Sequence, residues 1–399
     1  MRILIVTQYF WPESFRINDL ALGLLGRGHQ VTVLTGIPNY PGGELFDGYG
    51  FFNKREDYCG VRILRVPLIP RGTGGSFRLI LNYLSFAVMA TVLGPLLCRE
   101  AYDRIFVFEP SPITVGIPAV FLKKLKKAPM LFWVQDLWPE SLIATGAVRS
   151  KAIVSMVGHI VEFIYRHCDL ILVQAKAFCG PVAQQGGSEE KIRYFPNAAE
   201  NLYDFPVFSS ELPPLPEGFR ILFAGNIGAA QDFETIIAAA ENVKDHSDIK
   251  WIIIGDGRMR AWSEAEVQRR NLRNVYFLGK YPPEAMPAFF AHADALLVTL
   301  KKEPVFALTV PSKIQSYLAC GKPIIAALEG EASRIITESG SGFCCPAGDA
   351  DALAEAVLKM YATPEAERKK IGDNGRAYHK KNFDRDLLLD KLEQWLKEI

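Results

Sequence analysis

The sequence predicts an α/β protein with two Rossmann-like domains, each built on a doubly wound parallel sheet. Three observations support this fold class. The 399 residues are enough for two domains with separate cores. Short apolar runs alternate with amphipathic helical stretches, and a proline-rich segment interrupts the alternation once, near the middle of the chain. We expect the carboxyl ends of both sheets to face one central cleft.

The first domain is expected over residues 1–198 and opens as a β-α-β unit. An apolar strand over 2–7 precedes a helix over 14–26, and a second strand follows over 30–35. Further strands, each followed by a helical stretch, are expected over 103–108, 130–134 and 169–173. The proline-rich segment 195–219 is interpreted as a linker, because proline fits neither a helix interior nor a central strand.

The second domain, expected over 199–382, repeats the same alternation. Its strands are expected over 219–224, 249–254, 274–278, 294–298, 322–325 and 342–344. The chain closes with a helical pattern over 364–398, which is broken at Asn382 and restarts at the capping residue Asp384. This last segment, 383–399, is a candidate for crossing back onto the first domain.

Composition narrows the function classes. The formal net charge of +1 hides an asymmetry, because residues 1–198 carry 21 Lys and Arg against 15 Asp and Glu (+6) and the remainder carries −5. The basic half suggests an anionic partner such as phosphate or a membrane surface, whereas a pI near 7.6 argues against a nucleic-acid binder. Seven cysteines without a CxxC pair, and an amino terminus without a cleavable signal pattern, indicate a cytoplasmic location.

The strongest motif is Gly225-Asn226-Ile227-Gly228, which joins a strand to a helix. Glycines let the backbone approach a ligand, and the free N–H groups of a helix start favour a phosphate. A tight turn without a ligand is the alternative. The motif has neither the ending of a Walker A loop nor GxGxxG spacing, so ATP hydrolysis and nicotinamide binding lose their main support.

A second loop follows the strand expected over 249–254. It contains Gly255-Asp256-Gly257 and leads to Arg258 at the start of a helix. An Asp-Gly turn is common without any ligand, so the motif gains weight only from its place after a strand.

A third segment combines hydroxyls and a lysine at a helix start. It contains Thr309, Pro311, Ser312 and Lys313. Hydroxyls, an ammonium group and helix N–H groups together suit a diphosphate. A capped helix with a solvated lysine is the alternative.

These segments, in this order and spacing, resemble the donor-binding domain of GT-B glycosyltransferases of family four, a retaining family that uses sugar nucleotides. The first half matches the family through TQYFWPESFRINDLA and WVQDLWPESL, so the resemblance spans essentially the whole chain. The runs FAGNIGAAQ, IIIGDG, FLGKYP and PSKIQSYLACGKPIIA are similar, more narrowly, to the WbuB-like subgroup of L-fucosamine transferases in surface-polysaccharide assembly.

The resemblance implies a set of donor-binding positions, some of which depart from the family pattern. The family usually presents Arg and Lys to the diphosphate where this chain has Asn226 and Gln231, and its paired glutamates align with Leu308 and Ser316. The donor-binding residues that it implies are Gly225, Asn226, Ile227, Gly228, Arg258, Gly279, Lys280, Tyr281, Thr309, Pro311, Ser312, Lys313 and Ser316.

Without the usual cations, Lys313 and Arg258 are expected to be the main positive charges on the diphosphate. The base, usually uracil in such enzymes, is expected to rest against the backbone of Gly279-Lys280-Tyr281. The resemblance therefore favours UDP over GDP as the nucleotide.

Polar residues of the first half are candidates for the sugar and acceptor side. Relatives often place a His in the loop where this chain has Gln135 and Asp136. Asp136 is a candidate catalytic residue that holds a sugar hydroxyl or stabilises positive charge on the anomeric carbon, and capping of the following helix is the alternative. Glu13 is the second catalytic candidate. Further candidates on this side are Arg16, Asn18, Glu109 and, from the second domain, Glu329.

No metal site and no cofactor are expected, and the UDP-sugar is the donor substrate. The six His show no ligand spacing, and helix capping explains the D-x-D pairs that start at Asp349 and Asp384. Helix N-termini and Lys313 are then expected to meet the charge of the departing diphosphate. Retention would run by front-face attack assisted by the leaving phosphate.

Residues 79–98 form an apolar stretch without a charge. Its length suffices for a membrane span, but a span would separate strands that must pair in one sheet. A buried helix and a helix that dips into the lipid interface are the alternatives, and the lysines at 123–127 can add attraction to anionic lipid. A peripheral protein on the inner face of the cytoplasmic membrane, acting on a lipid-diphosphate-linked glycan, would account for both features.

The predicted function is retaining transfer of a hexosyl or aminodeoxyhexosyl group from a UDP-sugar to a lipid-linked or polysaccharide acceptor in surface-glycan biosynthesis. Two alternatives stay open. A UDP-sugar 2-epimerase of GT-B fold would need clear carboxylates and His in both domains. A catalytically inactive sugar-nucleotide-binding protein is suggested by the missing Arg, Lys and paired Glu.

Overall fold

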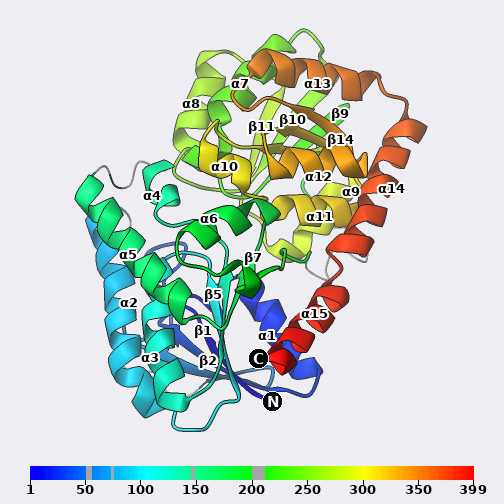
Figure 1. Ribbon diagram of the computed structural model, residues 1–399. Coiled ribbons are helices and arrows are strands. Elements are labelled where there is room, and N and C mark those ends of the chain that lie inside the picture. Colours follow the sequence, from blue (N-terminus) through cyan, green and yellow to red (C-terminus); the bar gives the residue numbers. More distant parts are fainter. Residues whose placement is uncertain (51–55, 73–75, 145–147, 149, 200–211) are drawn as a thin grey trace. The chain divides into compact units, whose positions relative to one another are not determined.

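A computed structural model describes residues 1–50, 56–72, 76–144, 148, 150–199 and 212–399. The chain divides into two compact units, each with its own sheet (Figure 1). Unit 1 comprises Met1–Pro196 and Leu388–Ile399, and unit 2 comprises Asn197–Leu387. The expected linker falls partly on residues 200–211, which lie outside the described residues.

The sheet of unit 1 has eight strands in the order β3-β4-β2-β1-β5-β6-β7-β8. All neighbours are parallel except the antiparallel pair β3 and β4. The strands are β1 (Arg2–Val6), β2 (Gln30–Gly36), β3 (Glu56–Tyr58), β4 (Val61–Val66), β5 (Arg104–Glu109), β6 (Met130–Val134), β7 (Leu170–Val173) and β8 (Ile192–Tyr194).

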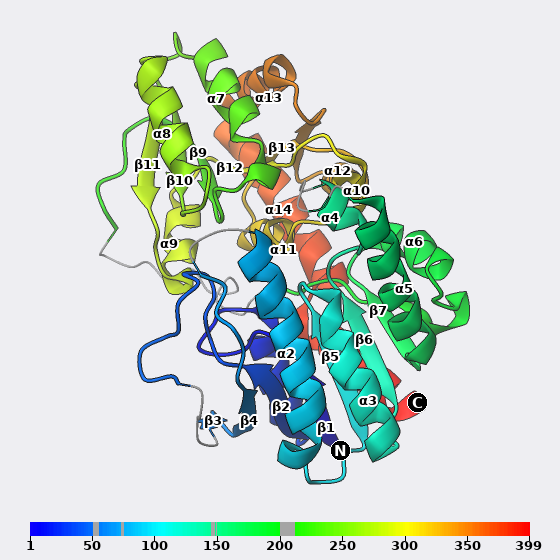
Figure 2. The ribbon, with the colours of Figure 1, turned by 90° about the vertical axis from the view of Figure 1, so that its left-hand side faces the viewer.

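Helices cover both faces of this sheet, as the continuous apolar strands require. Helices α2, α3 and α5 lie on one face (Figure 2), and α2 packs against α3, which in turn contacts α5. The helices are α1 (Arg16–Gly26), α2 (Ser76–Leu97), α3 (Gly116–Lys126), α4 (Glu140–Ala144), α5 (Lys151–His167), α6 (Cys179–Gln184) and, from the end of the chain, α15 (Arg385–Glu398).

Helix α15 packs on unit 1 through contacts along its length. Arg27, directly after α1, pairs with Asp390 at 2.5 Å, and Arg104 donates a hydrogen bond of 2.6 Å to the Leu396 carbonyl. The Leu387 N–H donates to the Asp384 carboxylate at 2.9 Å, so Asp384 caps this helix.

The sheet of unit 2 has six parallel strands in the order β11-β10-β9-β12-β13-β14. The strands are β9 (Phe219–Ala224), β10 (Ile249–Ile254), β11 (Val275–Gly279), β12 (Ala295–Thr299), β13 (Ile324–Ala327) and β14 (Gly342–Cys345). The helices are α7 (Phe233–Asn242), α8 (Arg260–Arg269), α9 (Met286–Ala291), α10 (Pro304–Leu308), α11 (Ser312–Cys320), α12 (Glu331–Ser339), α13 (Ala350–Ala362) and α14 (Glu365–Asn382).

The predicted fold class, two doubly wound parallel-sheet domains, is confirmed. Both sheets follow the apolar periodicity of the sequence, and the second changes strand order between β9 and β12, where such folds bind ligands. Strand β4 has no counterpart in the sequence prediction, because Arg62 and Arg65 interrupt its apolar run. The short strands β3 and β8 were not predicted either.

Candidate functional site

In unit 2, the loops after β9 and β10 are joined by backbone hydrogen bonds at the carboxyl edge of the sheet. The Ile227 N–H donates to the Asp256 carbonyl at 2.8 Å, and the Met259 N–H donates to the Ile227 carbonyl at 2.9 Å. Gly225 also donates to the Ile254 carbonyl at 2.9 Å. The first two sequence motifs therefore form one layered structure.

The close approach of these two loops explains their glycines. A Cβ at Gly255 would lie 1.8 Å from the Gly225 carbonyl oxygen, and one at Gly257 would lie 2.4 Å from that of Ile227. Both glycines also have positive φ angles, +142° and +156°. The packing of the two loops alone requires that these two positions have no side chain. The Gly-Asp-Gly motif is therefore not by itself evidence of a ligand.

Lys313 extends from the first turn of α11 over the glycine loop. Its ammonium group lies 3.5 Å from the centroid of the Phe223 ring and 3.0 Å from Oε1 of Gln231. A Cβ at Gly225 would come within 3.0 Å of the Lys313 Cε atom, so a side chain there would collide with the lysine. Burial lowers the pKa of Lys313 from its usual 10.5 to about 7. An anionic ligand beside Lys313 would favour the charged ammonium form.

The hydroxyl groups near the start of α11 have partners within the chain. Thr309 donates to the Val305 carbonyl at 3.0 Å, and the buried Ser316 donates to the Ser312 carbonyl at 3.4 Å. Pro311 precedes the helix and makes no side-chain cap. The Thr309 and Ser316 hydroxyls therefore donate within the chain, and Lys313 supplies the positive charge in the first turn of α11.

The two arginines after β10 occupy different surroundings. Arg258 is exposed and takes part in no ion pair among the described residues. Arg260 pairs with Glu264 at 2.8 Å, and its guanidinium lies 3.9 Å from the place of a Cβ on Gly279. The sequence prediction selected Arg258, whereas Arg260 is the arginine that lies against the proposed base-binding backbone.

The remaining donor-side candidates of unit 2 lie at the end of β11, and Glu329, a candidate for the sugar and acceptor side, follows β13. Gly279 accepts a hydrogen bond of 2.8 Å from the Gly255 N–H, which brings the segment with Lys280 and Tyr281 next to the Gly-Asp-Gly loop. Glu329 is exposed and precedes Gly330, whose Cβ position lies 1.8 Å from the Ala307 carbonyl oxygen. The loop after β13 is thus packed against α10, immediately before Lys313 in the chain.

In unit 1, Glu13 joins the loops after β1 and β2. One carboxylate oxygen accepts 2.8 Å hydrogen bonds from the N–H groups of Asn39 and Tyr40, and the other accepts a 3.3 Å bond from the Phe10 N–H. The side chain is buried, and burial raises its pKa to about 7. Asn18 donates to the Glu13 carbonyl at 2.7 Å. These bonds give Glu13 a positioning role in the loop architecture.

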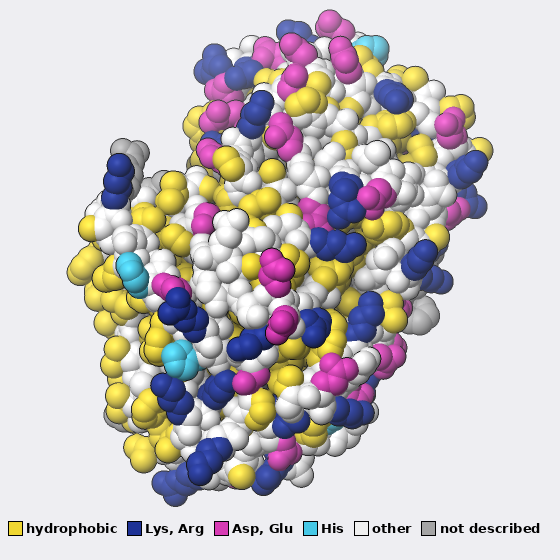
Figure 3. Space-filling model, in the orientation of Figure 1, with side chains coloured by type: hydrophobic (Ala, Val, Ile, Leu, Met, Phe, Trp, Pro, Cys, Tyr) yellow, Lys and Arg dark blue, Asp and Glu magenta, His cyan; other side chains and the backbone are white. Residues whose placement is uncertain are grey.

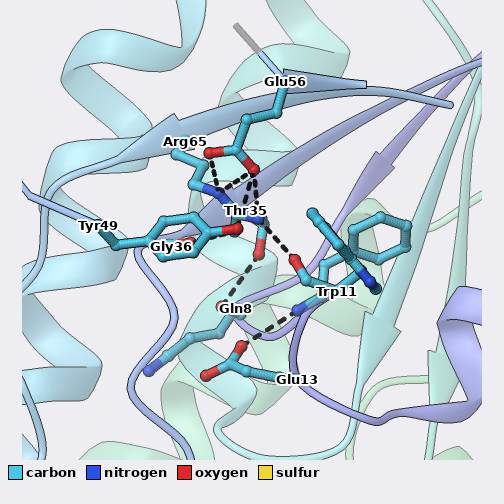
Figure 4. A network of polar contacts seen from close by, with 9 residues as sticks. Gln8, Trp11, Glu13, Thr35, Gly36, Tyr49, Glu56 and Arg65 are labelled. Atoms are coloured by element: carbon cyan, nitrogen blue, oxygen red, sulfur yellow. Dashed lines mark hydrogen bonds and ion pairs between the residues drawn. The ribbon is translucent and has the colours of Figure 1, made fainter. Parts of the chain in front are cut away.

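Arg65 holds the same two loops from the side of β4 (Figure 4). It donates to the carbonyls of Trp11 at 2.6 Å and Gly36 at 3.0 Å, and it pairs with Glu56 at 2.8 Å. The guanidinium also lies 5.0 Å from the centroid of the Tyr49 ring. Only 1% of the Arg65 side chain is exposed. Sequence reasoning missed this residue, because nothing local distinguishes it from Arg62 on the same strand.

Glu109 and Asp136 form a second group at the carboxyl ends of β5 and β6. Burial raises the pKa of Asp136 to about 6, and the Ser141 hydroxyl donates to its carboxylate. Glu109 is fully buried, and burial, with the neighbouring charge of Asp136 as a second cause, raises its pKa well above the usual range. Only the N–H groups of Gln135 and Asp136 approach the Glu109 carboxyl, and within the described residues neither oxygen has a hydrogen bond of good geometry.

Gln135 and Gln174 extend this group along the sheet edge. Gln135 is half-buried next to Asp136, and Gln174 follows β7 and is buried. In the described part of the chain, Nε2 of Gln135 and Oε1 of Gln174 have no hydrogen-bond partner. Gln174 was missed, although the signal that identified Gln135, a polar residue directly after an apolar strand, applies equally to it. Arg16 begins α1 and lies apart from this group in the chain.

Across the described residues, no group of three or more His, Cys, Asp and Glu is arranged to hold a metal ion. The Asp349 carboxylate accepts a 2.9 Å hydrogen bond from the Ala352 N–H, so this residue caps α13 as expected.

The two halves of the chain match two families. Residues 14–198 match the glycosyl transferase 4-like domain, and residues 208–378 match the glycosyl transferases group 1. The chain is 24% identical over 424 residues to the colanic acid biosynthesis glycosyl transferase WcaI of Escherichia coli, with full coverage of both chains.

Solved structures with a similar fold cover the whole chain. Sucrose-phosphate synthase from Thermosynechococcus elongatus has a TM-score of 0.76 at 18% identity and is covered over 98% of its length. HepE of Anabaena, in complex with UDP, has a TM-score of 0.70 at 16% identity and is covered completely. These likenesses support the GT-B fold that the sequence predicted.

Proposed function

Because this chain is a glycosyltransferase of GT-B type, we propose that it transfers a sugar, with retention of configuration, from a UDP-sugar to a lipid-linked or polysaccharide acceptor in glycan biosynthesis. The observation that carries the proposal is Lys313, whose ammonium lies over the glycine loop beside the first turn of α11. A lysine, helix N–H groups and a glycine backbone are suited to a diphosphate. HepE, which has a similar fold, was crystallised with UDP, and this supports the choice of nucleotide.

In this proposal the diphosphate leaves against the positive charge of Lys313 and the N–H groups of α11. The anomeric C–O bond to the phosphate breaks, the acceptor oxygen bonds to the same face of the anomeric carbon, and the leaving phosphate oxygen takes the acceptor proton. Residues fixed before the reaction stabilise the charge without reorganisation. No step in the proposal uses a metal ion.

Asp136 is proposed as the residue that stabilises positive charge on the anomeric carbon. With a pKa of about 6 it is mostly ionised at neutral pH, and burial also raises the pKa of its neighbour Glu109. Glu13 is proposed to act through loop position, since its oxygens already accept backbone N–H groups. We further propose a hexosyl or aminodeoxyhexosyl group as the transferred sugar, on the resemblance to the WbuB-like subgroup.

We also propose that unit 1 rests on the inner face of the cytoplasmic membrane. Within the described residues, Phe77–Leu97 is apolar and long enough to cross a membrane, but Asn82 and Phe86 of this helix are buried in the domain. Its outer side joins α3 and α5 in an apolar face, visible at the left edge of Figure 3, and this apolar face consists of Phe77, Ile80, Leu84, Val88, Val92, Leu96, Phe121, Leu125, Ile153, Met156 and Phe163.

An exposed apolar face of this extent marks an interaction surface, and lipid is favoured because lysines adjoin it. Lys124 and Lys126 lie in the last turn of α3, next to Phe121 and Leu125, whereas Lys123 of the same turn is paired with Asp169 at 2.6 Å. Leu84 and Val88 are 47% and 58% exposed, so replacing both with Glu is compatible with folding. The double variant is expected to move from the membrane to the soluble fraction, and Trp262→Glu in unit 2 is the matched control. A folded double variant that stays with the membrane contradicts this proposal.

The nucleotide assignment is tested by thermal unfolding with a panel of UDP-, GDP- and dTDP-sugars. A ligand that binds the folded state raises Tm in proportion to its affinity and concentration. We expect UDP-sugars to raise Tm more than GDP- or dTDP-sugars at equal concentration. A larger shift with a GDP-sugar refutes the assignment. Release of UDP only when acceptor is present separates a transferase from an inactive binding protein.

A further inference from the structure

The loop that connects β4 to α2 contains an arginine held by aromatic rings. The Arg71 guanidinium lies 5.0 Å from the centroid of the Tyr40 ring and 5.9 Å from that of Tyr9. Its Nη1 atom donates to the Tyr9 hydroxyl at 3.4 Å, and the Arg71 backbone N–H donates to Oδ1 of Asn39 at 3.1 Å. Phe15 stacks on Tyr9 and contacts Tyr40, so the rings beneath the cation are themselves fixed.

This cation has no carboxylate partner among the described residues. No ion pair of the described chain includes Arg71, whereas Arg65, six positions earlier, is paired with Glu56. Glu13, an acidic residue of the neighbouring loops, has both oxygens on backbone N–H groups. An arginine that is fixed in place and half-buried while lacking a counter-ion is suited to an anionic ligand, because its planar fork matches phosphate oxygens.

Arg71 lies in the same neighbourhood as the proposed catalytic group. The Tyr83 hydroxyl of α2 is within hydrogen-bonding reach of Tyr9 and Ser111. Burial raises the pKa of Tyr83, and the opposing charges of Arg71 and Asp136 both act on it. Tyr83 is therefore near enough to both the Arg71 cation and the Asp136 carboxylate for their charges to act on it.

A second arginine and the apolar face begin at the same point of the chain. The Arg78 side chain passes within 2.8 Å of a Cβ position on Gly72, directly after Arg71, and it is exposed. Phe77, 75% exposed, lies beside it and opens the row of exposed apolar residues on α2. A molecule with a phosphate at Arg71 would thus have an apolar surface available for its chain.

We propose that Arg71, with Arg78 as a second cation, binds the phosphate of the acceptor, a glycan carried on a lipid phosphate or diphosphate. This inference rests on the proposed glycosyltransferase function and names its acceptor class. A bilayer phospholipid offers the same phosphate chemistry, so the experiment must separate the two sources.

The test uses the full chain and three probes: farnesyl diphosphate, farnesol, and vesicles of phosphatidylglycerol. Arg71→Ala is compared with wild type and with Arg99→Ala, which removes an exposed arginine just after the other end of α2. We expect Arg71→Ala to weaken farnesyl diphosphate binding by about 10- to 100-fold, the usual range for a charge-assisted phosphate contact. Arg99→Ala, farnesol binding and vesicle binding should change little. Arg71→Lys keeps the charge without the planar fork and should bind with intermediate affinity.

Several outcomes overturn the assignment. The assignment is wrong if farnesyl diphosphate binds the wild type no better than farnesol does, or if Arg71→Ala binds farnesyl diphosphate as tightly as the wild type does. Loss of vesicle binding alone would assign Arg71 to the bilayer instead of the acceptor. The rise in Tm with a UDP-sugar is measured on the same Arg71→Ala sample. This control shows, independently of the farnesyl probes, whether the variant is folded and its donor site intact. A wild type that no nucleotide sugar stabilises contradicts the proposed function, whatever the farnesyl probes give.

Discussion

The carboxyl edges of the two sheets use different chemistry. In unit 2 the edge consists of backbone: two interlocked glycine loops, the first turn of α11 and one lysine over the Phe223 ring. In unit 1 it consists of side chains, among them the carboxyl groups of Glu13, Glu109 and Asp136, whose pKa values are all raised by burial. A diphosphate looks alike in every nucleotide sugar and can be bound by backbone, whereas acceptors and sugars differ and call for side chains.

The largest effect on stability is expected from removing Arg65, which holds together the loops after β1 and β2 in unit 1. Arg65→Ala leaves Glu56 and the carbonyls of Trp11 and Gly36 without their partner. Breaking a buried pair in this way typically costs about 3–5 kcal/mol of unfolding free energy. Arg62→Ala is the control, because it removes a more exposed pair with Glu100 on the same strand and should cost about 0–1 kcal/mol. Urea unfolding measures the free energy of unfolding of both variants. Equal losses would show that the buried contacts of Arg65 add no more stability than the exposed pair of Arg62.

Next is Asp136→Asn, which keeps shape and removes charge. If the carboxylate stabilises the transition state, kcat should fall about 100- to 1000-fold, as it does when one preorganised electrostatic contact is lost. The KM for the donor should change little. Because the ionised form is the active one and its pKa is about 6, wild-type kcat should also fall as pH drops below that value, and the variant should lack this limb. A variant with wild-type kcat would contradict the catalytic role and assign Asp136 a structural role through its hydrogen bond with Ser141. Asp390→Asn, at an exposed ion pair, is the control.

These two predictions mark how far sequence reasoning reached. The strands of unit 2 and the loops that follow them could be predicted, because apolar periodicity and glycine spacing are local properties. The roles of Arg65 and Arg71 could not be predicted, because they depend on contacts that form only when the chain folds. Arg65 is paired with Glu56, whereas Arg71 packs against the Tyr40 ring. Glu13 was selected for its chemistry and position, but which atoms its oxygens would meet depended on the loop after β2.

A smaller effect is expected for Lys313→Ala on nucleotide binding. Loss of one charge-assisted contact should weaken UDP binding by about 1.5–3 kcal/mol, and calorimetry measures it directly. Lys244→Ala, an exposed lysine of unit 2, is the matched control. An unchanged Kd would assign the diphosphate to the backbone alone and would make the contrast between the two edges sharper still.

The smallest effect is a pH dependence that only unit 2 should impose on UDP binding. In the free protein burial holds the pKa of Lys313 at about 7, and a bound diphosphate favours the ammonium form and so raises this pKa. Affinity that depends on the charged lysine is therefore full below pH 7 and declines above it, by about fivefold between pH 7 and pH 8, because one proton must be taken up on binding. Calorimetry in two buffers of different ionisation enthalpy should detect this uptake.

Lys313→Arg, which stays charged, should bind UDP with an affinity that does not change with pH over the same range. A wild type as flat as Lys313→Arg would mean that the lysine is already charged when the ligand arrives, and the pH response of the enzyme would then belong to the carboxyl groups of unit 1.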